Sequence, residues 1–146
     1  MILINKALEY PTQFASNKDI YLFTANSTIK RNGCLVMGAG AALHVRETYP
    51  GSDRIFGARI KHLSIYGLVI SVVAGIGAFQ TKKHFAFDST VDIIKFSVER
   101  LTECALANPG VTFHLNYPGI NNGKLTVEVV QPLIDILPDN VLIYKI

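Results

Sequence analysis

Strand-like and helix-like segments alternate along this chain from residue 20 onward. Apolar and β-branched runs predict strands at 2–4, 20–25, 68–73, 77–81, 111–115 and 140–145. Helices are expected at about 38–48, 52–62, 91–107 and 125–137. Residues 5–19 are expected to form a loop or a weak helix. This alternation is typical of a mixed, largely parallel central sheet with helices on both faces, a three-layer α/β/α fold.

The composition indicates one globular domain spanning 1–146, because no repeat, low-complexity tract or linker divides the 146 residues. Hydrophobic residues make up 49% of the chain and charged residues 17%, which excludes an intrinsically disordered protein. The net charge is +3, and the basic residues form only short pairs such as Lys30-Arg31 and Lys82-Lys83. Binding to extended duplex nucleic acid is therefore disfavoured, whereas a small acidic ligand fits this charge.

Cellular context also follows from the sequence. The apolar start at 1–4 lacks the features of a signal peptide, and the longest apolar run, 67–79, contains three glycines and is too short to span a bilayer. Cys34 and Cys104 have no metal-binding or redox spacing, so we expect reduced thiols, with Cys104 buried and Cys34 exposed. These features predict a cytoplasmic monomer with no membrane partner, no metal site and no cofactor.

Apolar positions at helical spacing predict the parts of two helices that face the core. The first set is Val91, Ile94, Val98, Leu101 and Ala105, after a capping segment at 88–90. The second set is Val127, Val129, Val130 and Leu133. We interpret three histidines as structural: His44, His62 and His114.

A glycine-rich segment connects the polar loop at 26–36 to the first long helix, and it reads Met37-Gly38-Ala39-Gly40-Ala41-Ala42-Leu43. Glycines at the start of a helix let the backbone approach a ligand closely. The free N–H groups and the positive end of the helix dipole then favour a phosphate. Turns and closely packed helices use the same residues, so an ordinary turn is the alternative.

A second loop of this kind precedes the last helix and reads Asn116-Tyr117-Pro118-Gly119-Ile120-Asn121-Asn122-Gly123-Lys124. Its backbone N–H groups suit a diphosphate, and Lys124 adds positive charge. The alternative is a turn rich in Asn and Gly. Together with the loops at 26–40 and 80–88, it is expected to lie at the carboxyl ends of the strands, where α/β sheets bind ligands.

Polar side chains at two strand ends are candidates for contact with a sugar. Asn26 can donate and accept hydrogen bonds, either to a ribose hydroxyl or within a turn of its own loop. Thr81-Lys82-Lys83-His84 ends another strand. Lys82, partly desolvated near a sugar, could attack an acetal carbon or stabilise the charge that develops there. The alternatives are solvated lysines at the sheet rim and, for His84, a role in holding the loop instead of donating a proton.

At these three motifs the chain resembles the macrodomains, α/β/α modules that bind ADP-ribose. The resemblance is to the branch with a Met-Gly-x-Gly-Ile-Ala-Leu loop, a strand-end Thr-Lys-Lys/Arg-His segment and a late Gly-x-Gly loop. Here the matching segments are Met37–Leu43, Thr81–His84 and Gly119–Gly123, in the same order and with similar separations. That branch includes hydrolases that remove ADP-ribose from glutamate side chains, and antitoxins that remove it from thymidine bases in DNA.

The resemblance implies a set of site residues. Lys82 would be the catalytic lysine. The second catalytic residue that we predict, His84, comes from its own place beside the lysines, where it would orient the reacting groups together with Asn26. Asn26 would lie near the distal ribose, and the remaining ligand contacts would come from Met37, Gly38, Ala39, Gly40, Ala41, Pro118, Gly119, Ile120, Asn121, Asn122 and Gly123. Gly38 to Ala41 would wrap the diphosphate, and Gly119 to Gly123 would close over the second phosphate and the distal ribose.

Three positions depart from the family pattern. The protein-directed hydrolases have a catalytic Asp where this chain has Gly123, whereas the DNA-directed antitoxins have glycine near that position. Asn121 replaces the usual second glycine of the late loop. The family's adenine-binding Asp follows the first strand, where Glu9 is the available acidic residue.

The resulting hypothesis is a mono-ADP-ribosyl hydrolase with a lysine-dependent mechanism, whose partner is ADP-ribose or an ADP-ribosylated macromolecule, either modified DNA or protein. The alternatives are a non-catalytic module that reads or sequesters ADP-ribose or a related signalling nucleotide, and a relative that no longer binds the ligand.

Overall fold

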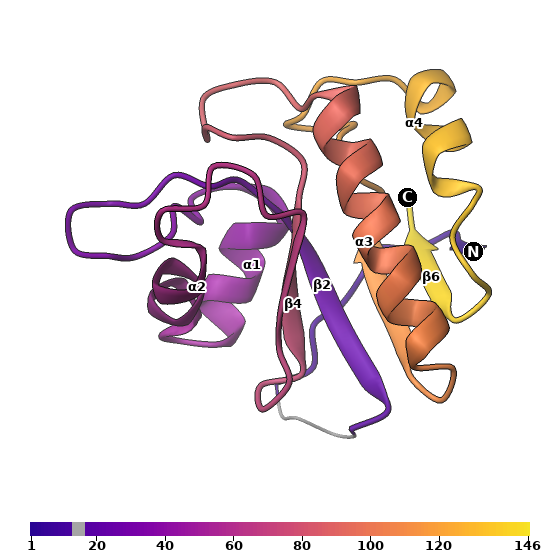
Figure 1. Ribbon diagram of the computed structural model, residues 1–146, viewed down its shortest axis with the longest axis horizontal. Helices are drawn as coiled ribbons and strands as arrows, with labels where there is room; N and C mark the ends of the chain where they lie inside the picture. Colours follow the sequence, from indigo (N-terminus) through magenta and orange to yellow (C-terminus); the bar gives the residue numbers. More distant parts are fainter. Residues whose placement is uncertain (13–16) are drawn as a thin grey trace.

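The computed structural model describes residues 1–12 and 17–146, which form a mixed sheet between two helical layers (Figure 1). The strands are β1 (Ile2–Ile4), β2 (Asp19–Ala25), β3 (Leu68–Ser71), β4 (Ile76–Gln80), β5 (Thr112–Asn116) and β6 (Val141–Tyr144). The helices are α1 (Gly40–Thr48), α2 (Ser52–Ile60), α3 (Val91–Ala107) and α4 (Val127–Ile134). Part of the loop or weak helix expected at 5–19 lies outside the described residues, and the rest is not helical.

The strand order is β1-β6-β5-β2-β4-β3, and neighbouring strands are parallel except for the antiparallel pair β3 and β4. The fold is therefore the predicted three-layer α/β/α arrangement with a mixed, largely parallel sheet. β2 lies between β4 and β5, so the carboxyl ends of these three strands meet at one edge. Ligand-binding loops of α/β proteins gather at such an edge.

Two hydrophobic clusters separate the layers. Helices α1 and α2 lie on one face of the sheet, and α3 and α4 lie on the other (Figure 1). In β2, Phe23 packs into the cluster with Val45 of α1 and Phe56 of α2, while Leu22 packs into the cluster with Leu101 of α3. Burial of each such Leu or Phe side chain stabilises the folded state by roughly 1.5–3 kcal/mol, so β2 stabilises the packing on both faces of the sheet.

Helix boundaries differ from the predictions at three places. Ala39 is extended (φ −153°), so α1 begins at Gly40 and not at residue 38. The residue preceding α2 is Gly51, in the left-handed region at φ 92°, so the prediction that Ser52 or Asp53 caps this helix was wrong. The last helix runs from Val127 to Ile134 and is shorter than 125–137; before its start, the Leu125 N–H donates to the Gly119 carbonyl and closes the preceding loop.

Burial differs from the predictions at four residues. Val91 is 38% exposed and Val129 44% exposed. Val91 lies in the first turn at the edge of the buried stripe of α3, and Val129 points about 100° around α4 from the buried Val130. Cys34, expected to be exposed, is buried because its loop packs on α2: a Cβ at Gly57 would lie 2.9 Å from the Cys34 Cα. Cys104, expected to be buried, is only half-buried, and this partial burial raises the pKa of its thiol.

Within the described ranges, none of the helices has the length and apolar character needed to cross a membrane. Of the three histidines interpreted as structural, His114 lies in β5 and is buried. Its ring is hydrogen-bonded to Tyr144 Oη (2.7 Å) and to Asp19 Oδ1 (2.8 Å), and it stacks on Tyr21.

Candidate functional site

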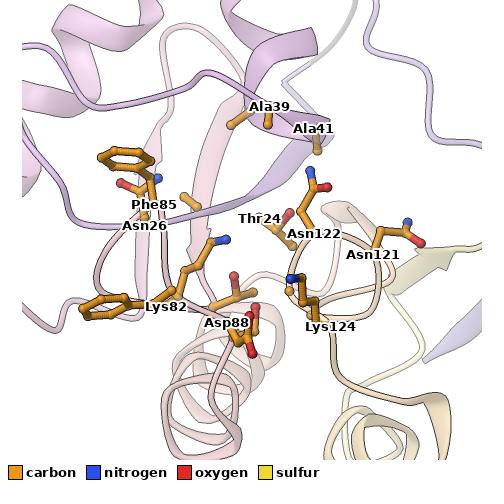
Figure 2. Close-up of a pocket in the computed structure, with 18 of the residues that line it drawn as sticks. Thr24, Asn26, Ala39, Ala41, Lys82, Phe85, Asp88, Asn121, Asn122 and Lys124 are labelled. Atoms are coloured by element: carbon orange, nitrogen blue, oxygen red, sulfur yellow. The ribbon is translucent and has the colours of Figure 1, made fainter.

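The carboxyl ends of β2, β4 and β5 form the floor of a cavity of about 500 Å³ (Figure 2). Its walls come from the segments at 36–42, 81–89 and 116–124. Loops that are distant in sequence thus converge, as expected for the ends of parallel strands.

Thr24 and Asn116 join the ends of β2 and β5 on this floor. Asn116 Oδ1 accepts from the Thr24 N–H (3.3 Å), and Asn116 Nδ2 donates to Thr24 Oγ1 (3.1 Å). Both residues line the cavity, and the Thr24 hydroxyl keeps its own proton for donation to a ligand. Neither residue stands out in the sequence as a binding residue, although both are polar residues at the ends of predicted strands.

Asn26 is buried and also lines the cavity. Its Nδ2 donates to the Val36 carbonyl (3.0 Å), and its Oδ1 accepts from the Thr28 N–H (2.8 Å). The turn within its own loop, one of the two interpretations from sequence, is therefore present. The amide fixes the loop that carries one wall of the cavity.

The start of α1 forms the second wall and leaves its backbone N–H groups open. The residue preceding the helix is Ala39, and no side chain among the described residues caps this end. Gly40 has φ 58°, and a Cβ there would lie 3.0 Å from Asn122 Nδ2, so the two glycine loops touch across the cavity. Figure 2 shows Ala41 and Asn122 facing each other at this place. Free N–H groups at a helix start suit an anion.

The late loop packs closely against the start of α3. Gly119 has φ 80°, and its carbonyl accepts from the Leu125 N–H. A Cβ at Gly123 would lie 2.3 Å from Ser89 Oγ and 2.5 Å from the Gly119 oxygen. The Ser89 N–H donates to the Gly123 carbonyl (2.9 Å). A side chain at 123 would overlap the Gly119 backbone and Ser89, so the catalytic Asp that the resemblance implies for protein-directed hydrolases has no room in this loop.

Lys82 extends from the end of β4 into the cavity (Figure 2). Its side chain is half-buried, and this desolvation lowers the pKa of the amine. Nearby Asp88 opposes the shift and Lys124 reinforces it. A lysine with a lowered pKa has a larger neutral fraction near neutral pH, which is the form that acts as a nucleophile.

Three residues predicted to act in the site lie outside the cavity lining. Met37 and Pro118 are buried, and the Met37 side chain belongs to the core under α1. His84 is directed to its own loop. Its Nδ1 accepts from the Ala86 N–H (3.1 Å), and its ring lies 4.5 Å from that of Phe85. This contact matches the loop-holding alternative for His84.

Two exposed aromatic side chains line the cavity at its mouth. Phe85 is 51% exposed and Phe87 is 61% exposed, and both rings contact the ring of His84. The Phe85 N–H donates to Thr28 Oγ1 (3.2 Å), which attaches this aromatic segment to the loop after β2. The rings are thus held in place at the rim.

A second cavity, of about 370 Å³, adjoins the first. The two share Gly40, Ala41, Asn116 and residues of the late loop. Its other walls come from 7–10 and from the chain end at 144–146. Glu9, the proposed substitute for an adenine-binding Asp, is exposed and lies outside the lining, whereas its neighbours Leu8 and Tyr10 are part of it.

These features define a three-layer α/β/α module with a phosphate-type cleft at the carboxyl edge of its sheet, and solved structures identify this fold as that of the macrodomains. The macrodomain of Mycobacterium tuberculosis DarG matches 98% of this chain and 98% of its own length, with a TM-score of 0.70 and 22% identity. The macrodomain of Thermus aquaticus DarG matches 97% of both chains, with a TM-score of 0.65 and 18% identity.

The Thermosipho africanus DarTG structure, which is in complex with ADP-ribose, covers 88% of this chain with a TM-score of 0.68 and 20% identity. This chain spans 38% of that protein's length. No protein-family model matches the sequence, and no curated protein matches it. The comparisons therefore show the macrodomain fold.

Proposed function

We propose that this protein binds ADP-ribose and removes it from a modified macromolecule by a lysine-dependent reaction. The observation that carries this proposal is the position of Lys82: its partly desolvated amine lies in a cavity framed by two glycine loops. The DarG macrodomain fold and the ADP-ribose complex of the Thermosipho africanus protein support this ligand.

The dimensions of the two joined cavities suit the two halves of ADP-ribose. The diphosphate is placed at the open start of α1, between Gly40 and Asn122, where backbone N–H groups can receive it. The adenosine half then occupies the second cavity, beside Tyr10 and Tyr144. The distal ribose lies in the first cavity, within reach of Thr24 and Lys82.

The proposed chemistry uses the neutral Lys82 amine. It attacks the anomeric carbon of the distal ribose, forming a C–N bond as the bond to the modified group breaks. The leaving group departs with the electron pair and takes up a proton. Water then cleaves the C–N bond, which releases ADP-ribose and restores the amine. Alternatively, the protonated amine donates its proton to the leaving group, and water attacks the positively charged anomeric carbon.

Turnover is expected to rise with pH and then to reach a plateau. The plateau is expected at a lower pH than the one at which an exposed lysine loses its proton. The pKa of Lys82 is lowered in the folded protein, so the neutral amine accumulates as pH rises through that lowered value. In the same range the unfolded chain binds more protons than the folded chain, so stability also rises with pH at this group. Initial rates across pH 6–10 measure the profile. Rates that fall with rising pH would indicate the protonated amine instead.

The cavity mouth favours DNA over protein as the modified macromolecule. A nucleobase that carries ADP-ribose would leave the cavity beside the exposed rings of Phe85 and Phe87, on which a planar base can stack. Exposed Lys124 lies in the adjoining late loop and can approach the strand's phosphates. A glutamate side chain would gain less from these rings.

Replacement of both Phe85 and Phe87 by alanine is expected to raise KM for an ADP-ribosylated oligonucleotide about tenfold, because stacking contributes roughly 1–3 kcal/mol per base. Affinity for free ADP-ribose, measured by calorimetry, is expected to stay unchanged. Ile136→Ala, at a residue 60% exposed on the surface after α4, is the matched control. An unchanged KM in the double variant would contradict recognition of the base.

The test of the function combines two measurements. Calorimetry with ADP-ribose tests binding, and incubation of excess protein with ADP-ribosylated DNA and with ADP-ribosylated protein tests release of ADP-ribose. Release from one substrate supports the hydrolase and identifies its substrate. Tight binding without release from either supports the alternative of a binding module, for which the absent late-loop carboxylate is the specific observation. No binding refutes both.

A further inference from the structure

Gln80 is a fully buried amide at the end of β4, two residues before Lys82. A buried amide has to satisfy both its oxygen and its nitrogen inside the protein. Gln80 Oε1 accepts from the N–H groups of Tyr66 (2.8 Å) and Gly67 (3.1 Å). Its Nε2 donates to the carbonyls of Ser64 (2.8 Å) and Lys82 (3.2 Å). The amide therefore uses all four of its hydrogen-bonding positions.

These four bonds connect the segment before β3 to the backbone of the lysine. The connection continues at the next residue, because the Lys83 carbonyl accepts from the Ser27 N–H (2.8 Å). Ser27 Oγ also lies 2.9 Å from both the Lys83 and the Ser64 carbonyl oxygens. Two consecutive carbonyls at 82 and 83 are thus held by neighbouring loops at the point where the chain leaves the sheet.

We propose that Gln80 is a positioning residue that directs the Lys82 side chain into the cavity. This proposal rests on the proposed role of Lys82 in catalysis. A lysine side chain has four rotatable bonds, so its amine samples a large volume unless the backbone at its base is fixed. Effective attack on a bound sugar requires the amine near the anomeric carbon, and displacement by about 1 Å can lower the rate about 100-fold.

The contacts of Gln80 explain why this site requires an amide. An apolar side chain would leave two N–H groups and two carbonyls without their buried partner. A carboxylate would keep an acceptor for Tyr66 and Gly67 but would face the Ser64 and Lys82 carbonyls with lone pairs. The glutamine amide supplies both an acceptor for the two N–H groups and a donor for the two carbonyls, and its Nε2 is the atom that bonds to the Lys82 carbonyl.

The test compares Gln80→Met and Gln80→Glu with the wild type. Methionine keeps the length and volume without any hydrogen-bonding group, and glutamate keeps the acceptor side but replaces the donor by a charged acceptor. We expect kcat for release of ADP-ribose to fall about tenfold or more in both variants, because the Lys82 backbone is no longer held in place and the amine loses its position. KM and the affinity for ADP-ribose are expected to stay within about twofold, because Gln80 lies outside the cavity lining.

The control is Ser97→Ala. Ser97 is fully buried, and its Oγ donates to the Gln80 main-chain carbonyl (2.6 Å) without contacting Lys82. This variant lowers stability through a lost buried hydrogen bond and is expected to leave kcat unchanged. If it lowers kcat as much as Gln80→Met does, general loss of stability explains both effects and the proposal fails. Unchanged kcat in Gln80→Met and Gln80→Glu would also overturn it.

A second readout is independent of turnover. Lysines methylated with ¹³C-formaldehyde can be titrated by NMR, and the Lys82 signal is assigned by its loss in Lys82→Arg. In Gln80→Met, which adds no charge, this signal is expected to titrate at higher pH than in the wild type, because a released side chain becomes more solvated. Unchanged titration would refute the positioning role even if the wild type released no ADP-ribose. A wild-type protein that releases no ADP-ribose would refute the proposed hydrolase function, whatever the titration shows.

Discussion

Lys82→Ala is expected to lower release of ADP-ribose at least about 100-fold, which is the usual range for a lost catalytic group. The variant removes the amine from the cavity but leaves the open start of α1 and the late loop intact. Affinity for ADP-ribose is therefore expected to change by less than about tenfold, or about 1.4 kcal/mol. Single-turnover assays with modified DNA, combined with calorimetry, separate these two effects.

The matched control is Lys83→Ala. It removes the same charge from the adjacent residue, whose side chain is exposed and outside the cavity lining. We expect near wild-type turnover from it. Equal losses in the two variants would indicate that the lysines contribute only positive charge, and full activity of Lys82→Ala would remove the basis of the proposed mechanism.

Gly123→Asp, which introduces the carboxylate that the sequence resemblance implies for protein-directed hydrolases, is expected to damage the site instead of activating it. The new Cβ would lie 2.3 Å from Ser89 Oγ and 2.5 Å from the Gly119 carbonyl oxygen. Relief of this overlap has to move the late loop, and overpacking of this kind costs about 1–3 kcal/mol of unfolding free energy. Denaturant unfolding and calorimetry are expected to show lower stability and weaker ADP-ribose binding.

Two further variants separate size from charge. Gly123→Ala adds only the overlapping methyl group, so it is expected to lower stability in the same direction. Asn122→Asp places a carboxylate at the exposed neighbouring position and is expected to keep wild-type stability. A Gly123→Asp protein with unchanged stability and faster turnover would show that the loop has room for an acidic residue.

The architecture was predictable because it depends on local patterns. β-Branched and aromatic runs, helical apolar spacing and glycine or proline at segment ends each act over a few residues. They predicted all six strands, the four helices and the three-layer fold. Errors occurred where packing overrides pattern, as at Cys34, which the close approach of Gly57 buries.

The three loops of the candidate site were also predictable, because the carboxyl ends of parallel strands meet at one edge. The individual roles of their residues were less so. Asn26 was assigned to a ribose or to a turn on equal chemistry, and only the structure places its amide in the turn. His84 similarly contacts its own loop, since its Nδ1 accepts from the Ala86 N–H and the residue is not part of the cavity lining.

By itself, the sequence determined the order of strands and helices, the glycines that precede two helices and the lysine at the end of β4, since these follow from residue type and spacing. Only the tertiary structure decided which atoms meet: the Thr24–Asn116 pair, the contact between Gly40 and Asn122, and the four hydrogen bonds of Gln80. These contacts join residues far apart in the chain, and their geometry depends on how the whole sheet and its helices pack.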